Sequence, residues 1–201
     1  MNNGAIILAA GKGFRFKALK QFVELKNKPL WKHVFDKVIL QIPKENVVVV
    51  GVDIPGGETR SLSVRAGLEH LHPATERVII LEAARPLVTI EQINILLDNK
   101  HPSASFVMPL TNTVVMRNGC YINRDEMYEL LTPQAFQYRM LKDAYQTGKF
   151  ENLTDDTRVM FEMYNIKPFF IETSDNLMKI TYQKDIKVAE ALMDLYNKEK
   201  R

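Results

Sequence analysis

Short apolar runs alternate with amphipathic stretches along the first half of the chain. Four runs are apolar at nearly every position, as expected for strands buried on both faces: residues 5–8, 47–50, 78–81 and 104–110. Between these runs, apolar residues recur at helical spacing over residues 31–38, 61–71 and 93–97. This alternation predicts an α/β fold, with a mostly parallel central sheet covered by helices on both faces.

The second half of the chain interrupts this rhythm once. Asn118 and Gly119 form a turn signal between two short apolar runs, so we expect a small projecting hairpin, a β-arm, over about residues 113–124. Beyond the arm the pattern predicts a helix that includes Phe136, a helix capped within residues 154–156, a late strand and a C-terminal helix. We find neither repeats nor a linker, so we expect one domain spanning residues 1–201.

Composition excludes several classes of protein. The 201 residues include 27 basic and 24 acidic side chains, scattered along the chain, and the net charge of +3 is too small to suggest nucleic-acid binding. We find no apolar run long enough to span a membrane. We find no basic stretch before the first apolar run, so we do not expect a secretory signal. The lone Cys120 excludes a disulfide framework and a multi-cysteine zinc site. We therefore expect a cytoplasmic protein with a free thiol.

Residues 8–16, LAAGKGFRF, directly follow the first predicted strand. In open α/β sheets ligands bind beyond the carboxyl ends of strands, and glycines there allow backbone N–H groups to approach a phosphate chain. A dinucleotide fingerprint is excluded because Phe16 stands where it needs glycine, and a Walker A loop because Gly13 follows the lysine. Arg15 and Lys20 could neutralise a nucleoside triphosphate. The alternative is a tight turn with two solvated cations.

Five motifs, taken together, resemble one family of enzymes. They are LAAGxGxR at 8–15 with KQF at 20–22, GGETRxxSVRxGL at 56–68, AARPxVT at 83–89, TPQAF at 132–136, and TDD at 154–156 with KIT at 179–181. Occurring in this order over about residues 5–193, they resemble the cytidylyltransferases that act on 2-C-methyl-D-erythritol 4-phosphate and on ribitol 5-phosphate. The first motif alone is shared by many nucleotidyltransferases and does not specify the nucleotide.

The resemblance implies a Rossmann-like nucleotidyltransferase domain that converts CTP and a polyol phosphate into a CDP-polyol and pyrophosphate, with Mg²⁺. It implies nucleotide contacts from Ala9, Ala10, Gly11, Gly13, Gly57, Glu58, Ser63 and Ala83. It implies charge stabilisation by Arg15, Lys20 and Lys179. It implies acceptor contacts from Thr113, Arg124 and Thr132. In the family the arm exchanges between two subunits, so a homodimer is expected, with no membrane or nucleic-acid partner.

The implied reaction needs no protein nucleophile. An oxygen of the acceptor's phosphate attacks the α-phosphorus of CTP in line, and pyrophosphate leaves. That oxygen is already ionised at neutral pH, so a strong general base is unnecessary. Catalysis then depends on positioning and on charge neutralisation by Arg15, Lys20, Lys179 and Mg²⁺.

This chain departs from the family pattern in several places. Glu82 stands at the position of an aspartate near the metal and substrate, and we expect it to hold Mg²⁺ directly or through water. Leu19 replaces a proline, Asn112 replaces an acid, and the loop before Lys20 and the arm are both short. One extra residue stands near Asn176. Because the departures gather on the acceptor side, they favour ribitol 5-phosphate or a related acceptor.

Three alternatives remain at this stage. The acceptor could be 2-C-methyl-D-erythritol 4-phosphate. Glu82 at the aspartate position raises a second alternative, a nucleotide-binding partner protein that has lost catalysis. The third alternative is transfer of uridylyl or guanylyl groups from the same fold. An acceptor atom facing the exocyclic amino group of cytosine, from Glu58 or a backbone carbonyl, would favour CTP.

Overall fold

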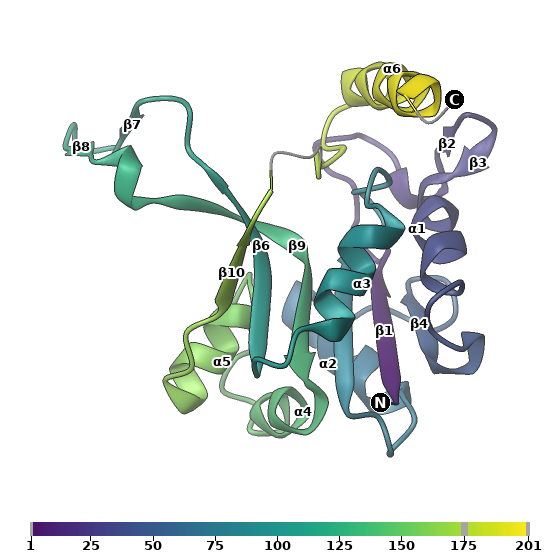
Figure 1. The fold of residues 1–201 in the computed structure, drawn as a ribbon, viewed down its shortest axis with the longest axis vertical. Coiled ribbons are helices and arrows are strands. Elements are labelled where there is room, and N and C mark those ends of the chain that lie inside the picture. The colour runs from purple at the N-terminus through teal and green to yellow at the C-terminus, as the bar shows by residue number, and fades with distance from the viewer. Residues whose placement is uncertain (1, 174–176, 200–201) are drawn as a thin grey trace.

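The computed structural model describes residues 2–173 and 177–199. Its centre is a six-stranded sheet in the order β10-β6-β9-β5-β1-β4 (Figure 1). The strands are β1 (Asn3–Leu8), β4 (Val47–Val50), β5 (Arg77–Glu82), β6 (Ser103–Pro109), β9 (Tyr128–Gln137) and β10 (Phe169–Glu172). β9 runs antiparallel to β5 and β6, and the other neighbouring pairs are parallel. The predicted mostly parallel α/β sheet is confirmed.

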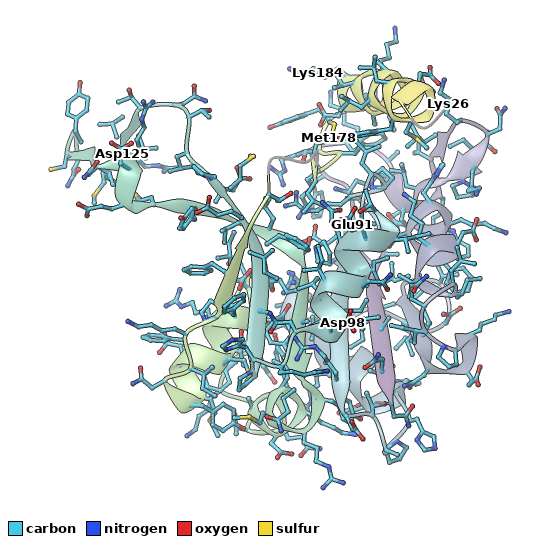
Figure 2. The ribbon with its side chains drawn as sticks, viewed as in Figure 1. Lys26, Glu91, Asp98, Asp125, Met178 and Lys184 are labelled. Atoms are coloured by element: carbon cyan, nitrogen blue, oxygen red, sulfur yellow. The ribbon has the colours of Figure 1, made fainter. Side chains whose placement is uncertain are left out.

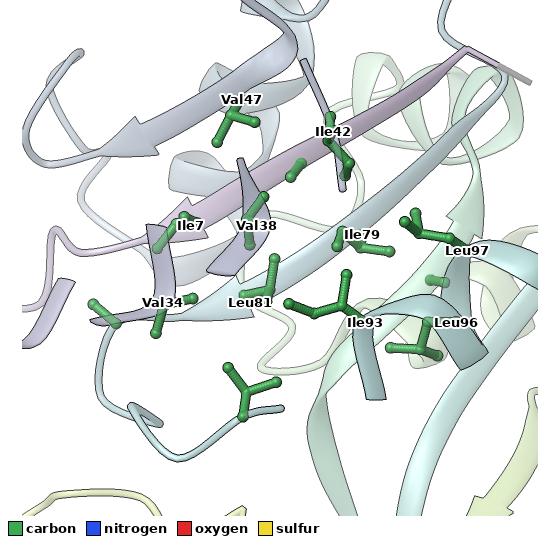
Figure 3. Close-up of a cluster of buried hydrophobic side chains, with 14 of the residues drawn as sticks. Ile7, Val34, Val38, Ile42, Val47, Ile79, Leu81, Ile93, Leu96 and Leu97 are labelled. Carbon is green, nitrogen blue, oxygen red and sulfur yellow. The ribbon is translucent and has the colours of Figure 1, made fainter. Parts of the chain in front are cut away.

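Helices cover both faces of this sheet. They are α1 (Leu30–Val38), α2 (Arg60–His70), α3 (Ile90–Asp98), α4 (Tyr138–Gln146), α5 (Asp156–Tyr164) and α6 (Lys184–Glu199). α1 and α3 pack on one face, where Ile7, Val34 and Ile93 belong to one buried cluster (Figure 3). α2, α4 and α5 pack on the other face, in a cluster that includes Ile6. Adjacent residues of β1 therefore point to opposite helical layers, as a strand requires.

The helix predicted to include Phe136 begins later, at Tyr138, because Phe136 belongs to β9. The sequence pattern did not predict β9, since Phe136, Met140 and Leu141 have helical spacing. Pro133 also argues against a central strand, because proline cannot donate to a β-ladder. The structure accommodates it at an irregularity: Ser105 pairs with Gln134, whereas the next residue, Phe106, pairs with Leu131. Pro133 therefore lies at a break in the ladder.

The arm projects from the ends of β6 and β9 (Figure 1). It contains β7 (Val114–Val115), which pairs with β8 (Tyr121–Ile122), and a 3₁₀ turn η3 (Arg124–Glu126). Gly119 donates to the carbonyl of Met116 at 2.8 Å and has φ +89°, as the predicted turn requires. The arm predicted over about residues 113–124 is therefore present.

α6 joins the segment 13–30 in a third, smaller apolar cluster. That segment contains η1 (Lys20–Phe22), β2 (Glu24–Leu25) and β3 (Lys28–Pro29). Outside it, a further 3₁₀ turn, η2 (Lys44–Asn46), precedes β4. We call the third cluster the loop–helix cluster; its buried members are Phe16, Leu25, Leu30, Ile180 and Ala189. Within the described residues, we find no helix both long and apolar enough to cross a membrane.

Candidate active site

A pocket of about 370 Å³ opens beyond the carboxyl ends of β1 and β5. Most of the residues that the sequence assigned to the nucleotide line it: Ala9, Ala10, Gly11, Gly57, Glu58, Ser63 and Ala83. Lys20, Lys179 and Glu82 line it as well. Its position matches the rule that ligands of open α/β sheets bind beyond the carboxyl ends of strands.

The glycine-rich loop makes a tight turn above this pocket. Gly13 has φ +64°, and a Cβ there would lie 1.8 Å from the carbonyl oxygen of Ala18. Lys17, also with positive φ, donates its N–H to the carbonyl of Gly13 at 2.7 Å. Gly13 therefore shapes the loop and lies outside the pocket lining, whereas Gly11 lies within it.

The other wall of the pocket is the segment before α2 and the first turn of that helix. Thr59 caps α2, because its hydroxyl oxygen accepts the N–H of Leu62 at 3.1 Å. The hydroxyl of Ser63 accepts the N–H of Gly57 at 3.1 Å and donates to the carbonyl of Thr59 at 3.0 Å. A Cβ on Gly57 would lie 2.3 Å from the Cβ of Leu62, so only glycine fits there. Ser63 therefore fixes the backbone around Gly57 and Glu58.

Lys20 and Lys179 come from distant parts of the chain and line the same pocket. The Lys20 ammonium donates to the carbonyl of Ile180 at 2.9 Å, one residue from Lys179. Burial, the positive charge of Lys179, and then those of Arg15 and Arg85 lower the pKa of Lys20, partly offset by Glu82. Arg15 itself is exposed and lies outside the pocket lining, although its charge reaches Lys20. The arrangement concentrates positive charge where a triphosphate would reduce the repulsion.

Glu82, at the end of β5, is the carboxylate that faces these cations. Its Oε2 forms a short ion pair with the Lys179 ammonium, and its Oε1 lies 3.9 Å from Nε of Arg60. Burial would raise the pKa of Glu82, but Lys179 and Arg60 outweigh it and hold that pKa below its usual value. Glu82, whose side chain is 13% exposed, is therefore a largely buried anion that balances two cations.

Arg60 leads from the pocket into a buried network. Its Nη2 lies 2.7 Å from Oδ2 of Asp156, the first residue of α5, and the Tyr145 hydroxyl donates to Oδ1 of Asp156 at 2.5 Å. Burial would lower the pKa of Arg60, but Asp156 reverses this and raises the pKa. Asp155 caps α5 by accepting the N–H of Thr157 at 2.8 Å, as the sequence predicted.

The predicted acceptor residues lie outside the pocket lining. Thr132, buried on β9, accepts a hydrogen bond from Nε of Arg85 at 3.0 Å, and Arg85 also donates to the carbonyl of Leu177. Thr113 and Arg124 are exposed on the arm. Figure 2 places Asp125, the neighbour of Arg124, well apart from Met178, the neighbour of Lys179. Asn176, where the extra residue was inferred, lies outside the described residues.

The donor set of the pocket is compatible with one divalent cation. Among residues 2–173 and 177–199, no three His, Cys, Asp or Glu side chains gather as a ready metal site. Mg²⁺ commonly binds through one or two carboxylates together with phosphate oxygens and water. Glu82 supplies such a carboxylate beside the cations that would face the phosphates.

Sequence reasoning missed some residues of this pocket. Lys12, Gln21, Thr59 and Arg60 line it, although each belonged to a quoted motif without an assigned role. A signal for Arg60 was present, because it follows the capping Thr59 and therefore lies in the first turn of α2. Its partner Asp156 is 96 residues away, so their contact could not be inferred from spacing.

A small cationic pocket with a glycine-rich wall can hold a nucleoside triphosphate and neutralise a leaving pyrophosphate.

Comparisons with known proteins agree with this chemistry. A curated 2-C-methyl-D-erythritol 4-phosphate cytidylyltransferase of Clostridium botulinum (strain Langeland / NCTC 10281 / Type F) is 31% identical over 224 residues, covering 96% of this chain and 97% of that protein. The bifunctional IspDF of Campylobacter jejuni has a TM-score of 0.81 at 26% identity, covering 93% of this chain and 54% of that chain. A 4-diphosphocytidyl-2C-methyl-D-erythritol synthase of Anaerococcus prevotii DSM 20548, 24% identical, shares the fold with a TM-score of 0.78 and covers 96% of each chain. The model of the 2-C-methyl-D-erythritol 4-phosphate cytidylyltransferase family matches residues 4–195, and the chain belongs to this family.

Proposed function

We propose that this chain transfers the cytidylyl group of CTP to 2-C-methyl-D-erythritol 4-phosphate, releasing pyrophosphate. The observation that carries the proposal is the meeting of Lys20 and Lys179 in one pocket with the glycine-rich loop. Family membership supports cytidylyl transfer. The names of the relatives support this acceptor over the ribitol 5-phosphate that the sequence departures favoured.

The base would lie against the wall formed by Gly57, Glu58 and Ser63, and the triphosphate under the glycine-rich loop. Glu58 is exposed at the pocket and supplies oxygen acceptors, which cytosine's amino group needs. Uridylyl transfer is the competing function, and uracil offers a carbonyl oxygen at that place. A wall that offers hydrogen-bond acceptors and no hydrogen-bond donor at this place would favour cytosine over uracil.

The acceptor's phosphate oxygen would attack the α-phosphorus in line. Lys20 and Lys179 would bind the triphosphate and stabilise the charge that develops on the pyrophosphate, and Arg15 would add a third charge from the loop. The triphosphate competes with Glu82 for Lys179, because the resting ion pair occupies that ammonium. Glu82 would hold Mg²⁺ with phosphate oxygens, and the bound ion would supply further charge neutralisation.

We infer that Thr113 and Arg124 serve the pocket of a partner subunit. On their own chain they lie on the projecting arm, outside the pocket lining. Exposed apolar side chains on the arm, Val115 at 53% and Tyr121 at 81%, support a contact with a second copy of the chain. Thr132, held by Arg85, would complete the acceptor site from β9.

Pyrophosphate release tests this function. The protein is incubated with Mg²⁺ and CTP, UTP or GTP, and with either 2-C-methyl-D-erythritol 4-phosphate or ribitol 5-phosphate. We expect release only with CTP and strongest with the methylerythritol acceptor. Lys179→Ala should lower kcat about a hundredfold, whereas Lys184→Ala, an exposed lysine on α6, should not. CTP binding without release for any acceptor would instead support the inactive partner protein.

A further inference from the structure

The loop–helix cluster connects the glycine-rich loop to the segment that carries Lys179. Phe16 is only 4% exposed, although its neighbours Arg15 and Lys17 are exposed. Its side chain packs in one cluster with Ile180, which follows Lys179. The sequence places an aromatic side chain at the end of a charged, glycine-rich loop, and the structure buries it away from the pocket lining.

Hydrogen bonds reinforce this apolar connection. The side-chain amide of Gln183 donates to the carbonyl of Phe16 at 3.3 Å, and Lys20 donates to the carbonyl of Ile180 at 2.9 Å. Ile180 donates its own N–H to the carbonyl of Ala84, just after β5, at 2.8 Å. These hydrogen bonds therefore connect the loop, the segment around Lys179 and the end of β5.

We propose that Phe16 is a positioning residue for cytidylyl transfer. Its burial in the loop–helix cluster holds Lys20 and Lys179 in place relative to each other in one pocket. The inference rests on the proposed function. It assigns a part in the reaction to α6, whose Ala189 packs in the same cluster although the helix lies outside the pocket lining.

The two lysines need such an anchor because their charges repel. Burial and the charge of Lys179 both oppose the charged form of Lys20. Before the triphosphate arrives, an unanchored segment between the glycine-rich loop and Lys20 would relieve this repulsion by moving outward. Apolar burial of Phe16 opposes that movement without adding a charge to the pocket. The loop is then already in place when CTP binds, and less ordering is required at that step.

The wall that faces the base is held separately. Ser63 and Thr59 fix the backbone at Gly57, and α2 packs through Val64 in the cluster on the opposite face of the sheet. Loss of the Phe16 side chain should therefore affect the triphosphate and leave binding of the nucleoside part unchanged. This difference separates positioning from general damage to the fold.

The test compares CTP with CMP in calorimetric titrations, together with steady-state kinetics. Phe16→Ala should weaken CTP binding about tenfold and lower kcat about thirtyfold. The effect on kcat should be smaller than that of removing a lysine, because a displaced ammonium keeps part of its stabilising interaction with the triphosphate. CMP affinity should stay within about twofold, since CMP lacks the two phosphates that these lysines would hold. Phe16→Leu, which refills most of the space, should recover most of both CTP affinity and kcat.

Leu96→Ala is the matched control, because Leu96 is fully buried on α3 in a different cluster. It should lower the melting temperature as Phe16→Ala does, without changing the ratio of CTP to CMP affinity. If Phe16→Ala gives no cooperative melting transition, the smaller truncation Phe16→Val replaces it with the same expected pattern.

Equal loss of CTP and CMP affinity in Phe16→Ala would overturn the inference, and so would unchanged CTP affinity and kcat. A Leu96→Ala variant that loses the CTP preference would overturn it too. Failure of the proposed function looks different, because the unmodified protein would then release no pyrophosphate from CTP with any acceptor.

Discussion

Lys20 carries its charge in a pocket that disfavours it. Burial and neighbouring cations lower its pKa, so the ammonium loses its proton at a lower pH than an ordinary lysine does. The activity should therefore be sensitive to alkaline pH through this residue, and the free enzyme should show it most clearly.

We expect the alkaline decline of kcat/KM for CTP to have its midpoint below the usual lysine value of about 10.4. The decline in kcat should occur at higher pH, because the bound triphosphate stabilises the ammonium. Lys20→Arg should move the alkaline decline in kcat/KM upward, since arginine stays protonated. Steady-state rates between pH 6 and about 10.5 measure this shift. Coincident alkaline limbs for the variant and the unmodified protein would assign the titration to another group.

Glu82 contributes to stability through its two cations. Its pKa in the folded protein is lower than in the unfolded chain, so it stabilises the fold above the unfolded value of about 4.3. That contribution is lost as the pH falls through the lower, folded pKa. Acid should therefore weaken the fold partly through this residue.

Glu82→Gln should reduce the free energy of unfolding by about 1–3 kcal/mol at pH 7, because a charged pair in the pocket is lost. The difference from the unmodified protein should shrink as the pH falls below the unfolded value of about 4.3 and through the lower, folded pKa. Urea unfolding at several pH values measures both effects, and Glu58→Gln, at an exposed carboxylate in the same pocket, is the control. A difference that stays constant with pH would contradict this account.

At the scale of elements, the ion pair between Arg60 and Asp156 joins α2 to α5. Asp156 is fully buried and its second oxygen accepts from Tyr145 of α4, so three helices on one face of the sheet meet at this carboxylate. Removing one partner leaves the other buried without compensation. The pair therefore supports the first turn of α2, which forms part of the pocket wall around Gly57, Glu58 and Ser63.

A double-mutant cycle tests this connection. Asp156→Ala alone should cost about 3–5 kcal/mol, and Asp156→Ala combined with Arg60→Met should cost less than the sum, with a coupling energy of about 1–3 kcal/mol. The exposed pair of Arg158 and Glu162 on α5 is the control, with a coupling below about 0.5 kcal/mol. Additive effects at Arg60 and Asp156 would contradict the coupling.

The elements that sequence could predict are those whose pattern is strong. Strands such as β4, with four successive valines, are apolar on both faces, and a buried parallel strand leaves just this pattern. β9 escaped prediction because its stability comes from two neighbouring strands and its Pro133 lies at a break in the ladder. Motif resemblance located most of the pocket, but the pairs Arg60–Asp156 and Glu82–Lys179 depend on tertiary folding alone.

At the scale of the whole molecule, the proposed role of Arg124 predicts that two copies of the chain share their sites. If Arg124 serves the partner's pocket, Lys179→Ala and Arg124→Ala damage opposite halves of each shared site. Mixed dimers of the two inactive variants should then hold one intact site. After subunit exchange at equal concentrations, activity should return to about a quarter of the unmodified value.

Pyrophosphate release before and after mixing measures this recovery. A mixture of Lys179→Ala with Lys20→Ala is the control, because both changes lie in the same pocket and no intact site can form. If mixing Lys179→Ala with Arg124→Ala restores no activity in a sample that sedimentation shows to be dimeric, Arg124 does not act in the partner's pocket.

The arm projects from the ends of β6 and β9, whereas the pocket is lined from the ends of β1 and β5 and from the start of α2. The hairpin can therefore lengthen, shorten or change its residues without disturbing the packing around that pocket. If the arm contacts the acceptor as proposed, changes within the hairpin should alter which alcohol phosphate is accepted and leave the choice of nucleotide unchanged.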